Sequence, residues 1–282
     1  MIKTRNLTKE YNAKVVVDSV NLTIGDGVSF GLLGPNGTGK TTILKMIASL
    51  VEPDLGSVEI NDQMMDRSCK KIKSELGMVS QHYSLHREMT PVEVLNLHGM
   101  LHRIPRKIRK KRIDDLLKFA DMDVDRDKLV DKLSGGNKRK LMILRSVMHG
   151  PSILFLDEPT VGLDASIRRS IWDLLKKLKE DGMTILITTH YIDEAYALCD
   201  EIAMIMDGKI ISQNSPQKYM DEIPDIVVES FDGERTSYEF FDDRHKASMY
   251  AENIHRNVLI RKTNLEDVYI KKTNKRIVGK RL

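Results

Sequence analysis

The chain has 282 residues, of which 41% are hydrophobic and 30% are charged, and its formal net charge is +4. A chain of this size can bury about three quarters of its unfolded surface in one full domain with a smaller appendage. Its longest apolar runs, such as residues 28–33 and 153–156, are far shorter than the roughly 18 residues that span a bilayer, so we expect no membrane crossing.

The charge and the cysteine content set the expected partners and compartment. A net charge of +4 is mild for this length, so no nucleic-acid partner is expected from the overall balance. Residues 1–5 lack the apolar segment of a secretory signal, and only Cys69 and Cys199 could pair. These features predict a cytoplasmic protein.

The first sixty residues predict strands interrupted by one helix. The β-branched runs at residues 15–17 and 28–30 are typical of strands. The helix begins after a glycine-rich loop and carries apolar residues at helical spacing, up to its expected end before Pro53. Its apolar positions are Ile43, Leu44, Ile47 and Leu50. Residues 53–56 are predicted to form a turn.

The rest of the chain predicts an α/β core with a helical insertion and a small C-terminal appendage. Residues from about 85 to 145 have helical periodicity and few β-branched residues, which indicates an inserted helical subdomain. Apolar runs then alternate with helical segments, an order typical of a parallel sheet. The runs are 153–156, 184–188 and 202–206, and the helical segments are 165–179 and 192–198. We therefore predict a main domain over residues 1–215 and an appendage over 216–282.

A phosphate-binding loop follows the apolar run that ends at Leu33. The sequence fits the pattern G-x-x-x-x-G-K-T between a strand and a helix, the context in which the pattern is specific. Backbone N–H groups of such a loop surround phosphate oxygens, the lysine adds a positive charge, and the following hydroxyl is suited to Mg²⁺. The predicted nucleotide-binding residues are Gly34, Pro35, Asn36, Gly37, Thr38, Gly39, Lys40, Thr41 and Thr42.

Two carboxylates end the apolar run at residues 153–156. Asp157 and Glu158 would lie at the carboxyl edge of a parallel sheet, where ligands bind. Beside the phosphate loop, we expect Asp157 to hold Mg²⁺ through water and Glu158 to orient or deprotonate the attacking water. Thr41 and Asp157 are therefore the predicted metal residues, together with Gln81.

Three further motifs complete a pattern that resembles the ATP-binding subunits of ABC transporters. The residues Leu-Ser-Gly-Gly-Asn at 133–137 resemble the family signature, Gly-Leu-Asp at 162–164 its D-loop, and Thr-Thr-His at 188–190 its switch histidine. The resemblance covers residues 1 to about 211. It implies a P-loop NTPase fold of the ABC type, with a mixed sheet core and an inserted helical subdomain.

The resemblance implies that two domains dimerise head to tail around two ATP molecules. Ser134, Gly135 and Gly136 would then contact the γ phosphate of the ATP held by the partner. A serine and free N–H groups at the start of a helix, expected here over residues 138–149, can bind an anion. An ordinary helix cap is the alternative interpretation.

The same resemblance assigns four other residues. Gln81 would sense Mg²⁺ and the attacking water, and His190 would contact the γ phosphate and support Glu158. Tyr11 would stack on adenine, and Asp164 would organise the dimer interface. The alternatives are a surface glutamine, a strand-end histidine and a surface tyrosine.

Basic residues gather at 102–112 and at 271–282. The first run lies in the predicted helical subdomain, which faces the membrane subunits in this family. A solvated helix face and a contact with acidic coupling segments or anionic lipid remain equal alternatives for it.

The pattern is most similar to ATPases paired with ABC-2 type exporter permeases. Asn137 stands at the fifth signature position, where many members have Gln, and Leu-Glu-Asp-Val-Tyr occurs at 265–269. The expected function is ATP hydrolysis that powers export through separate permease subunits at the inner face of the membrane, in a homodimer or a heterodimer. The alternatives are an importer ATPase and a soluble ABC ATPase acting on ribosomes or nucleic acid.

Overall fold

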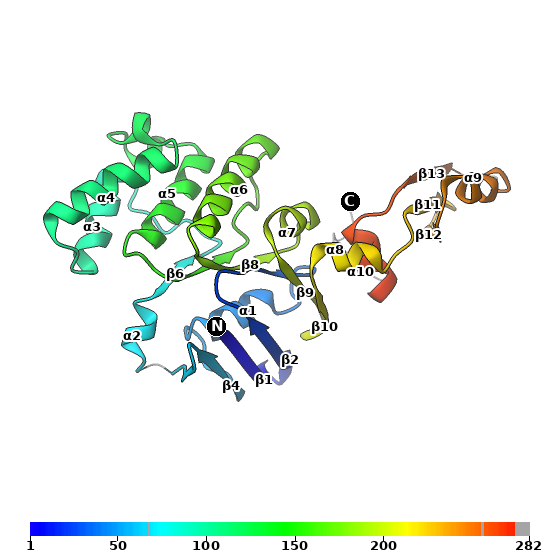
Figure 1. Ribbon diagram of the computed structural model, residues 1–282, viewed down its shortest axis with the longest axis horizontal. Coiled ribbons are helices and arrows are strands. Elements are labelled where there is room, and N and C mark those ends of the chain that lie inside the picture. Colours follow the sequence, from blue (N-terminus) through cyan, green and yellow to red (C-terminus); the bar gives the residue numbers. More distant parts are fainter. Residues whose placement is uncertain (67, 255–256, 274–282) are drawn as a thin grey trace.

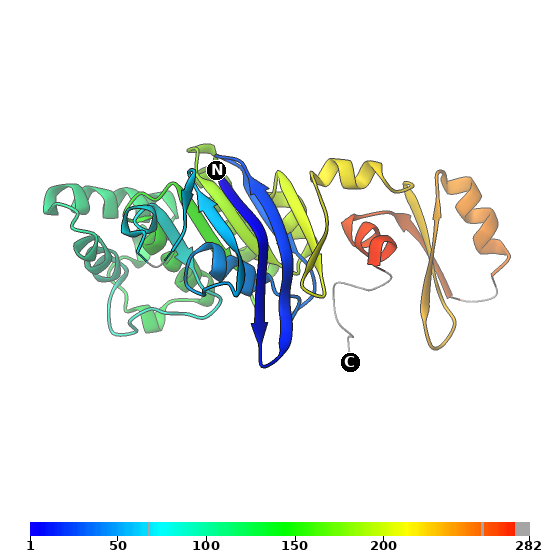
Figure 2. The ribbon, with the colours of Figure 1, turned by 90° about the horizontal axis from the view of Figure 1, so that it is seen from below.

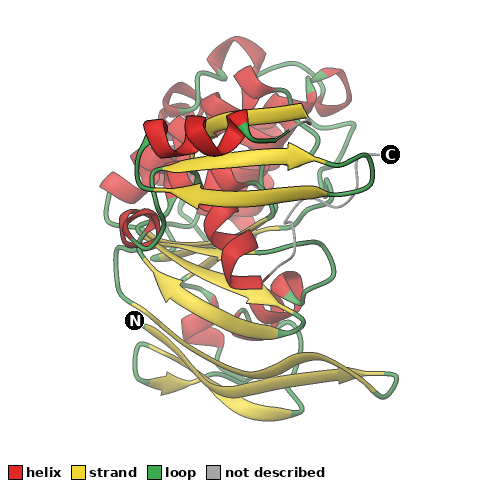
Figure 3. Ribbon diagram, turned by 90° about the vertical axis from the view of Figure 1, so that its right-hand side faces the viewer, coloured by secondary structure: helices red, strands yellow, loops and turns green. Residues whose placement is uncertain are grey.

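Three β-sheets and their covering helices make up the protein (Figure 1). The computed structural model describes residues 1–66, 68–254 and 257–273. A six-stranded, largely parallel sheet lies at the centre, a four-stranded antiparallel sheet lies on one side of it, and helices cover the other side (Figure 3). This arrangement confirms the predicted mixed α/β core.

The central sheet has the strand order β10-β9-β3-β8-β7-β6. Its strands are β3 (Ser29–Leu33), β6 (Leu76–Val79), β7 (Ile153–Asp157), β8 (Thr184–Thr189), β9 (Glu201–Met206) and β10 (Lys209–Asn214). Each neighbouring pair is parallel except β9 and β10. Because β3, β7 and β8 are buried along their whole length, they form apolar runs without alternation.

The antiparallel sheet has the order β2-β1-β4-β5. Its strands are β1 (Ile2–Tyr11), β2 (Lys14–Ile24), β4 (Leu55–Ile60) and β5 (Gln63–Met64). Helix α1 (Lys40–Ile47) contacts strands of both sheets and buries Ile43, Leu44 and Ile47 in the core that they share. This packing fixes the loop that precedes α1 against the carboxyl edge of the central sheet.

Two local predictions around α1 are wrong. The helix ends at Ile47, and Leu50 is 60% exposed instead of continuing the apolar face. Ser49 takes a left-handed conformation with φ +55°, and the N–H of Leu50 donates to the carbonyl oxygen of Lys45, which closes the helix. Leu55, predicted within a turn, is the first residue of β4.

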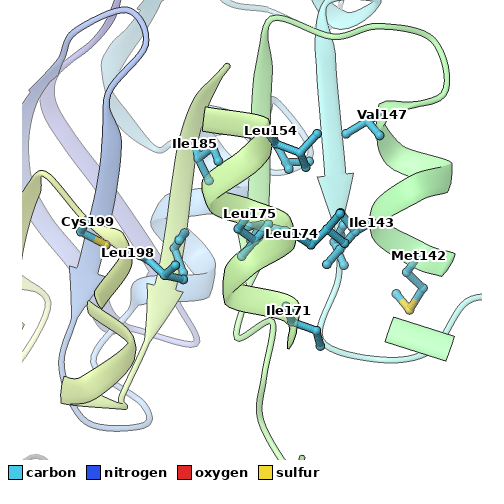
Figure 4. Packing of buried hydrophobic residues seen from close by; sticks show 14 of the residues in the cluster. Met142, Ile143, Val147, Leu154, Ile171, Leu174, Leu175, Ile185, Leu198 and Cys199 are labelled. Atoms are coloured by element: carbon cyan, nitrogen blue, oxygen red, sulfur yellow. The ribbon is translucent and has the colours of Figure 1, made fainter. Parts of the chain in front are cut away.

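Helices on the other face of the central sheet form the largest hydrophobic core. Leu154 of β7 and Ile185 of β8 lie in one cluster with Leu174 and Leu175 of α6 (Ala165–Glu180). Ile143 of α5 (Gly135–Val147) joins the same cluster (Figure 4). Helix α7 (Ile192–Leu198) covers the sheet next to β3 and β8. The elements that carry the sequence motifs are therefore held in one packed unit.

The helical insertion consists of three α-helices and two short 3₁₀ turns. They are α3 (Pro91–Leu101), α4 (Arg106–Phe119), η1 (Asp123–Asp125), η2 (Val130–Lys132) and α5, and the short α2 (Lys70–Lys73) precedes them. Thr90 and Glu93 form a capping box at the start of α3. Within the described ranges, no helix is both long and apolar enough to span a bilayer.

The C-terminal residues add a three-stranded antiparallel sheet at one end of the molecule (Figure 2). Its elements are α8 (Pro216–Asp221), β11 (Ile226–Phe231), β12 (Thr236–Phe241), α9 (Arg244–Glu252), β13 (Asn257–Lys262) and α10 (Leu265–Thr273). Tyr219 of α8 and Tyr269 of α10 are buried in the main core and donate hydrogen bonds to carbonyl oxygens of β9. The main hydrophobic core thus extends past residue 215, and the domain boundary at that residue remains a prediction.

Candidate nucleotide site

The predicted phosphate loop connects β3 to α1 and is bent by its glycines. Gly39 has φ +98° immediately before α1, and a Cβ added to it would lie 2.6 Å from the carbonyl oxygen of Val16. A Cβ on Gly34 would lie 2.4 Å from the carbonyl oxygen of Ile205. The loop therefore needs glycine at both positions, because its backbone runs directly against β2 and β9.

Lys40 is buried at the centre of this loop. Its ammonium group donates to the carbonyl oxygens of Gly34 at 2.8 Å and Pro35 at 2.9 Å, and lies 3.5 Å from Oε1 of Glu158. Burial lowers the pKa of Lys40, and the charges of Glu158 and Asp157 oppose that shift. Lys40 thus links the loop to the residue that follows β7.

Asp157 is the last residue of β7 and is held by two hydroxyl groups. Its Oδ1 accepts from Oγ1 of Thr41 at 2.8 Å and from Oγ1 of Thr188 at 2.7 Å. Thr41 belongs to α1 and Thr188 to β8, so three elements converge on one carboxylate oxygen. Thr188 was not among the predicted site residues, although it begins the Thr-Thr-His motif, because its contact with Asp157 depends on how two strands lie side by side.

Glu158 leaves the strand in a conformation that is uncommon for a residue with a side chain. Its φ is +48°, and its N–H donates to the carbonyl oxygen of Thr188 at 3.1 Å. Its Oε2 lies 2.9 Å from Nδ1 of His190. Burial raises the pKa of Glu158, but His190 and Lys40 outweigh burial, so the pKa is held below its usual value.

A cavity of about 300 Å³ opens beside these groups. Its walls combine the loop backbone with cationic, hydroxyl, amide and carboxylate side chains, a donor-rich lining suited to a polyphosphate. The lining residues are Val16, Asn36, Gly37, Gly39, Lys40, Thr41, Thr42, Gln81 and Glu158. The structure thus brings Gln81 to the phosphate loop.

Thr38 is buried beside the cavity and donates to the carbonyl oxygen of Pro35 at 2.9 Å.

Arg139 connects Gln81 to α5, and sequence reasoning did not find it. The side chain is 1% exposed and donates to the carbonyl oxygens of Ser80 at 2.9 Å and Gln81 at 2.8 Å. The guanidinium also lies 5.1 Å from the ring centroid of Tyr83. One buried cation therefore ties the Gln81 segment to the helix that begins at the predicted signature.

The signature turn begins α5 three residues earlier than predicted. Ser134 caps the helix by accepting from the N–H of Asn137 at 3.2 Å, and the first helical residue is Gly135. A Cβ on Gly136 would lie 2.4 Å from Cγ2 of Ile167, so α5 and α6 require glycine there. Ser134 and Gly135 are exposed, and neither lines the cavity at their own phosphate loop.

Two other predicted residues also lie away from that cavity. Asp164 caps α6 by accepting from the N–H of Ile167 at 3.0 Å, and this hydrogen bond lowers its pKa. Tyr11 ends β1, is 44% exposed and lies 5.4 Å from the ammonium group of Lys9. Neither side chain lines the cavity at the phosphate loop.

The basic run at residues 102–112 divides into packed and exposed side chains. Arg109 donates to Asn96 at 2.7 Å and Arg112 to the carbonyl oxygen of Met148 at 3.0 Å. Lys107, Lys110 and Lys111 are exposed on α4. Of the second basic cluster, residues 271–273 end α10 and residues 274–282 lie outside the described residues.

Comparison with known proteins identifies the family. The sequence profile described as ABC transporter matches residues 17–161, just over half of the chain. The chain belongs to the ABC transporter family. As a member, it is an ATPase of the ATP-binding cassette type.

Relatives of this ABC ATPase include proteins named for Nod factor export and for linearmycin resistance. The Nod factor export ATP-binding protein I of Ralstonia nicotianae is 37% identical over 232 residues, which cover 82% of this chain and 72% of the relative. The linearmycin resistance ATP-binding protein LnrL of Bacillus subtilis is 35% identical over 75% of this chain and 68% of its own.

A solved ATP-binding cassette is similar to this chain in structure. It is a dimer in a post-hydrolysis state with bound ADP and inorganic phosphate. The two chains share 31% identity with a TM-score of 0.69, over 76% of this chain and 98% of the cassette. The predicted family and fold are confirmed by these comparisons.

Proposed function

We propose that two copies of this chain close around two ATP molecules and that their hydrolysis drives export through separate membrane permease subunits. The observation that carries the proposal is the separation of two halves of a site within one chain. Lys40, Asp157, Glu158 and His190 gather at the phosphate loop, whereas Ser134 is exposed and lies outside that cavity. A second copy supplies the missing half.

The phosphate loop and the signature turn would contact the γ phosphate from opposite sides. The loop amides of residues 34–42 and the ammonium of Lys40 hold the β and γ phosphates. The exposed Ser134 hydroxyl and the N–H groups of Gly135 and Gly136 stand at the start of a 13-residue helix, where partial positive charge favours an anion. Tyr11 is proposed to stack on adenine, and Asp164 to lie at the dimer interface.

Thr41, Asp157 and Gln81 are proposed to hold Mg²⁺. Thr41 Oγ1 and Asp157 Oδ1 are 2.8 Å apart, and Gln81 lines the same cavity, so the donors are all oxygen atoms of the kind that Mg²⁺ prefers. When bound, the ion would offset the negative charge of the phosphates. These three residues therefore suit a bound Mg²⁺ ion.

Glu158 and His190 are proposed to act on the attacking water. A carboxylate whose pKa is kept low stays ionised at neutral pH and can orient the water or accept its proton. His190 Nδ1 lies 2.9 Å from the carboxylate and would orient it. Lys40, 3.5 Å from the other oxygen, would move to phosphate when ATP enters.

Export is favoured over the other functions by the names of the relatives. Proteins named for Nod factor export and linearmycin resistance share more than a third of their residues with this chain over the matched region. We propose an ABC-2 type permease as partner, at the inner face of the membrane. An importer ATPase, a soluble ABC ATPase on ribosomes and a heterodimer with a second ATPase subunit are the alternatives. Purification of the chain with its bound partners separates them.

Mixing two inactive variants tests whether the site is shared between chains. Lys40→Ala disables a phosphate loop, and Ser134→Arg blocks a signature turn. In a mixed dimer the phosphate loop of the Ser134→Arg chain faces the signature turn of the Lys40→Ala chain, so one complete site forms. We expect each variant alone to lose nearly all ATPase activity and the mixture to recover a substantial part of it.

The control makes the same serine-to-arginine change at an exposed position outside the site. Ser74 is exposed after α2, so Ser74→Arg should hydrolyse ATP normally. A mixture of Lys40→Ala and Ser134→Arg with no activity above the sum of its parts would contradict the shared site.

A further inference from the structure

Three histidines meet at one end of the helical insertion, away from the nucleotide site. His98 lies on α3, His102 follows the end of that helix, and His149 follows the end of α5. One nitrogen from each ring lies within 4.8 Å of the others. The rings of His102 and His149 are stacked with centroids 4.1 Å apart, and that of His98 is 4.6 Å from His102.

The hydrogen bond of His149 determines which of its nitrogens is free. Nε2 lies 3.1 Å from the carbonyl oxygen of Leu76, and a carbonyl only accepts, so Nε2 carries the proton. Nδ1 then has a lone pair, and it is buried without a hydrogen-bond partner. A carbonyl that orients a histidine in this way is the usual outer support of a metal ligand.

His98 offers a second buried nitrogen. Its Nε2 is also buried without a hydrogen-bond partner. Burial, with the neighbouring His102, lowers the pKa of both His98 and His149 to about 4, so both rings are neutral at physiological pH. Neutral imidazole is the form that binds metal ions, and two unpaired buried nitrogens cost free energy unless something binds them.

We propose that His98, His102 and His149 bind a Zn²⁺ ion. Imidazole suits this metal, and His98 and His102 are spaced four residues apart, which places them on one helix face. Nitrogens around a tetrahedral Zn²⁺ lie about 3.3 Å from one another. The exposed His102 ring closes the remaining distance by rotating, and water fills the fourth position from the open side.

Nearby cations limit the affinity of this site. The charges of Arg145 and Arg112 act on His98 and His149 respectively. Both guanidinium groups are engaged, Arg112 with the carbonyl oxygen of Met148 and Arg145 with Ser84. Because two positive groups face a dication held by neutral ligands, we expect a dissociation constant on the order of micromolar.

The ion would connect three elements of the fold. His98 lies on α3 and His102 directly follows it, His149 follows α5, and the Leu76 carbonyl belongs to β6 of the central sheet. Bound Zn²⁺ would therefore fasten the helical insertion to the edge of the sheet and stabilise the folded chain by mass action.

Equilibrium dialysis of the full chain against Zn²⁺ tests the proposal. Excess Mg²⁺ and ADP occupy the nucleotide site, so that its carboxylates do not compete for Zn²⁺. We expect one Zn²⁺ per chain, and X-ray absorption showing nitrogen ligands at about 2.0 Å. His98→Ala, His102→Ala and His149→Ala should each weaken Zn²⁺ binding more than about tenfold. His102→Ala is the most informative variant, because its side chain is exposed and its loss should not impair folding.

Two other histidines serve as controls. His245→Ala changes an exposed residue of α9, and His190→Ala changes the histidine at the nucleotide site, so both variants should bind Zn²⁺ as tightly as the native chain. Native chain that binds no Zn²⁺ at about 100 µM, far above the expected micromolar constant, would overturn the proposal. Equal binding by His102→Ala and the native chain would overturn it as well.

Discussion

The ionisation of Glu158 depends on a balance between burial and two neighbouring side chains, His190 and Lys40. Burial alone would raise the pKa of this carboxyl and leave a smaller fraction of it ionised. The contacts with His190 at 2.9 Å and Lys40 at 3.5 Å reverse that shift. The proposed base is therefore kept ionised by residues that are also proposed to bind phosphate.

His190→Ala should move the acid limb of the pH profile for kcat/KM to higher pH. Without the histidine, burial remains and raises the pKa of Glu158, so the carboxylate protonates at a higher pH than in the native chain. The rate at neutral pH should fall about 10²- to 10⁴-fold. Initial rates of ATP hydrolysis across pH measure both effects.

A matched histidine variant separates this effect from a general loss of stability. His245→Ala removes an exposed ring from α9 and should keep the native profile. An acid limb that stays in place in His190→Ala, with only the rate reduced, would show that His190 does not set the ionisation of Glu158.

At the scale of elements, α7 is fixed by one buried carboxylate. Oε1 of Glu194 accepts from the hydroxyl of Thr160 at 2.6 Å and from the indole N–H of Trp172 at 3.3 Å. Burial raises the pKa of Glu194, and the hydrogen bonds oppose that shift. This side chain therefore joins α7 to α6 and to the segment after β7.

Glu194→Ala should lower the free energy of unfolding by about 1–3 kcal/mol, because a buried hydroxyl and a half-buried indole N–H lose their acceptor. Glu194→Gln keeps an acceptor oxygen and should cost less. The raised pKa also predicts that native stability falls as the pH rises from the ordinary glutamate range through the folded value, and that Glu194→Gln removes this dependence.

Urea unfolding of the variants measures these differences. Asp193→Ala, at the exposed neighbouring position, should leave stability nearly unchanged. If Glu194→Ala unfolded at the same urea concentration as Asp193→Ala, Glu194 would not be the anchor of α7.

The sequence predicts those elements well whose position depends on a local pattern of residues. The buried strands β3, β7 and β8 and the phosphate loop follow from apolar runs and glycine spacing. The start of α5 could not be predicted in this way, because glycine disfavours helices. Gly135 and Gly136 stand in the first turn because Gly136 packs on Ile167 and Ser134 caps the helix. Arg139 and Glu194 act through contacts distant in sequence, which periodicity cannot reveal.

At the scale of the whole molecule, the proposed function requires the chain to present one half of each of two nucleotide sites. The phosphate loop and its carboxylates form a cavity, and the signature turn stands exposed elsewhere on the surface. A solved cassette of 31% identity is a dimer with ADP and inorganic phosphate bound. ATP-dependent dimerisation is thus the central claim of the proposed function.

Glu158→Gln tests this claim most directly, measured by light scattering on size-exclusion chromatography with and without ATP. The amide cannot accept a proton from water, so hydrolysis should fall about 10²- to 10⁴-fold while binding persists. We predict that the variant is monomeric without nucleotide and forms a stable dimer in ATP and Mg²⁺. A variant that stays monomeric with ATP while it hydrolyses ATP at the native rate would contradict the account.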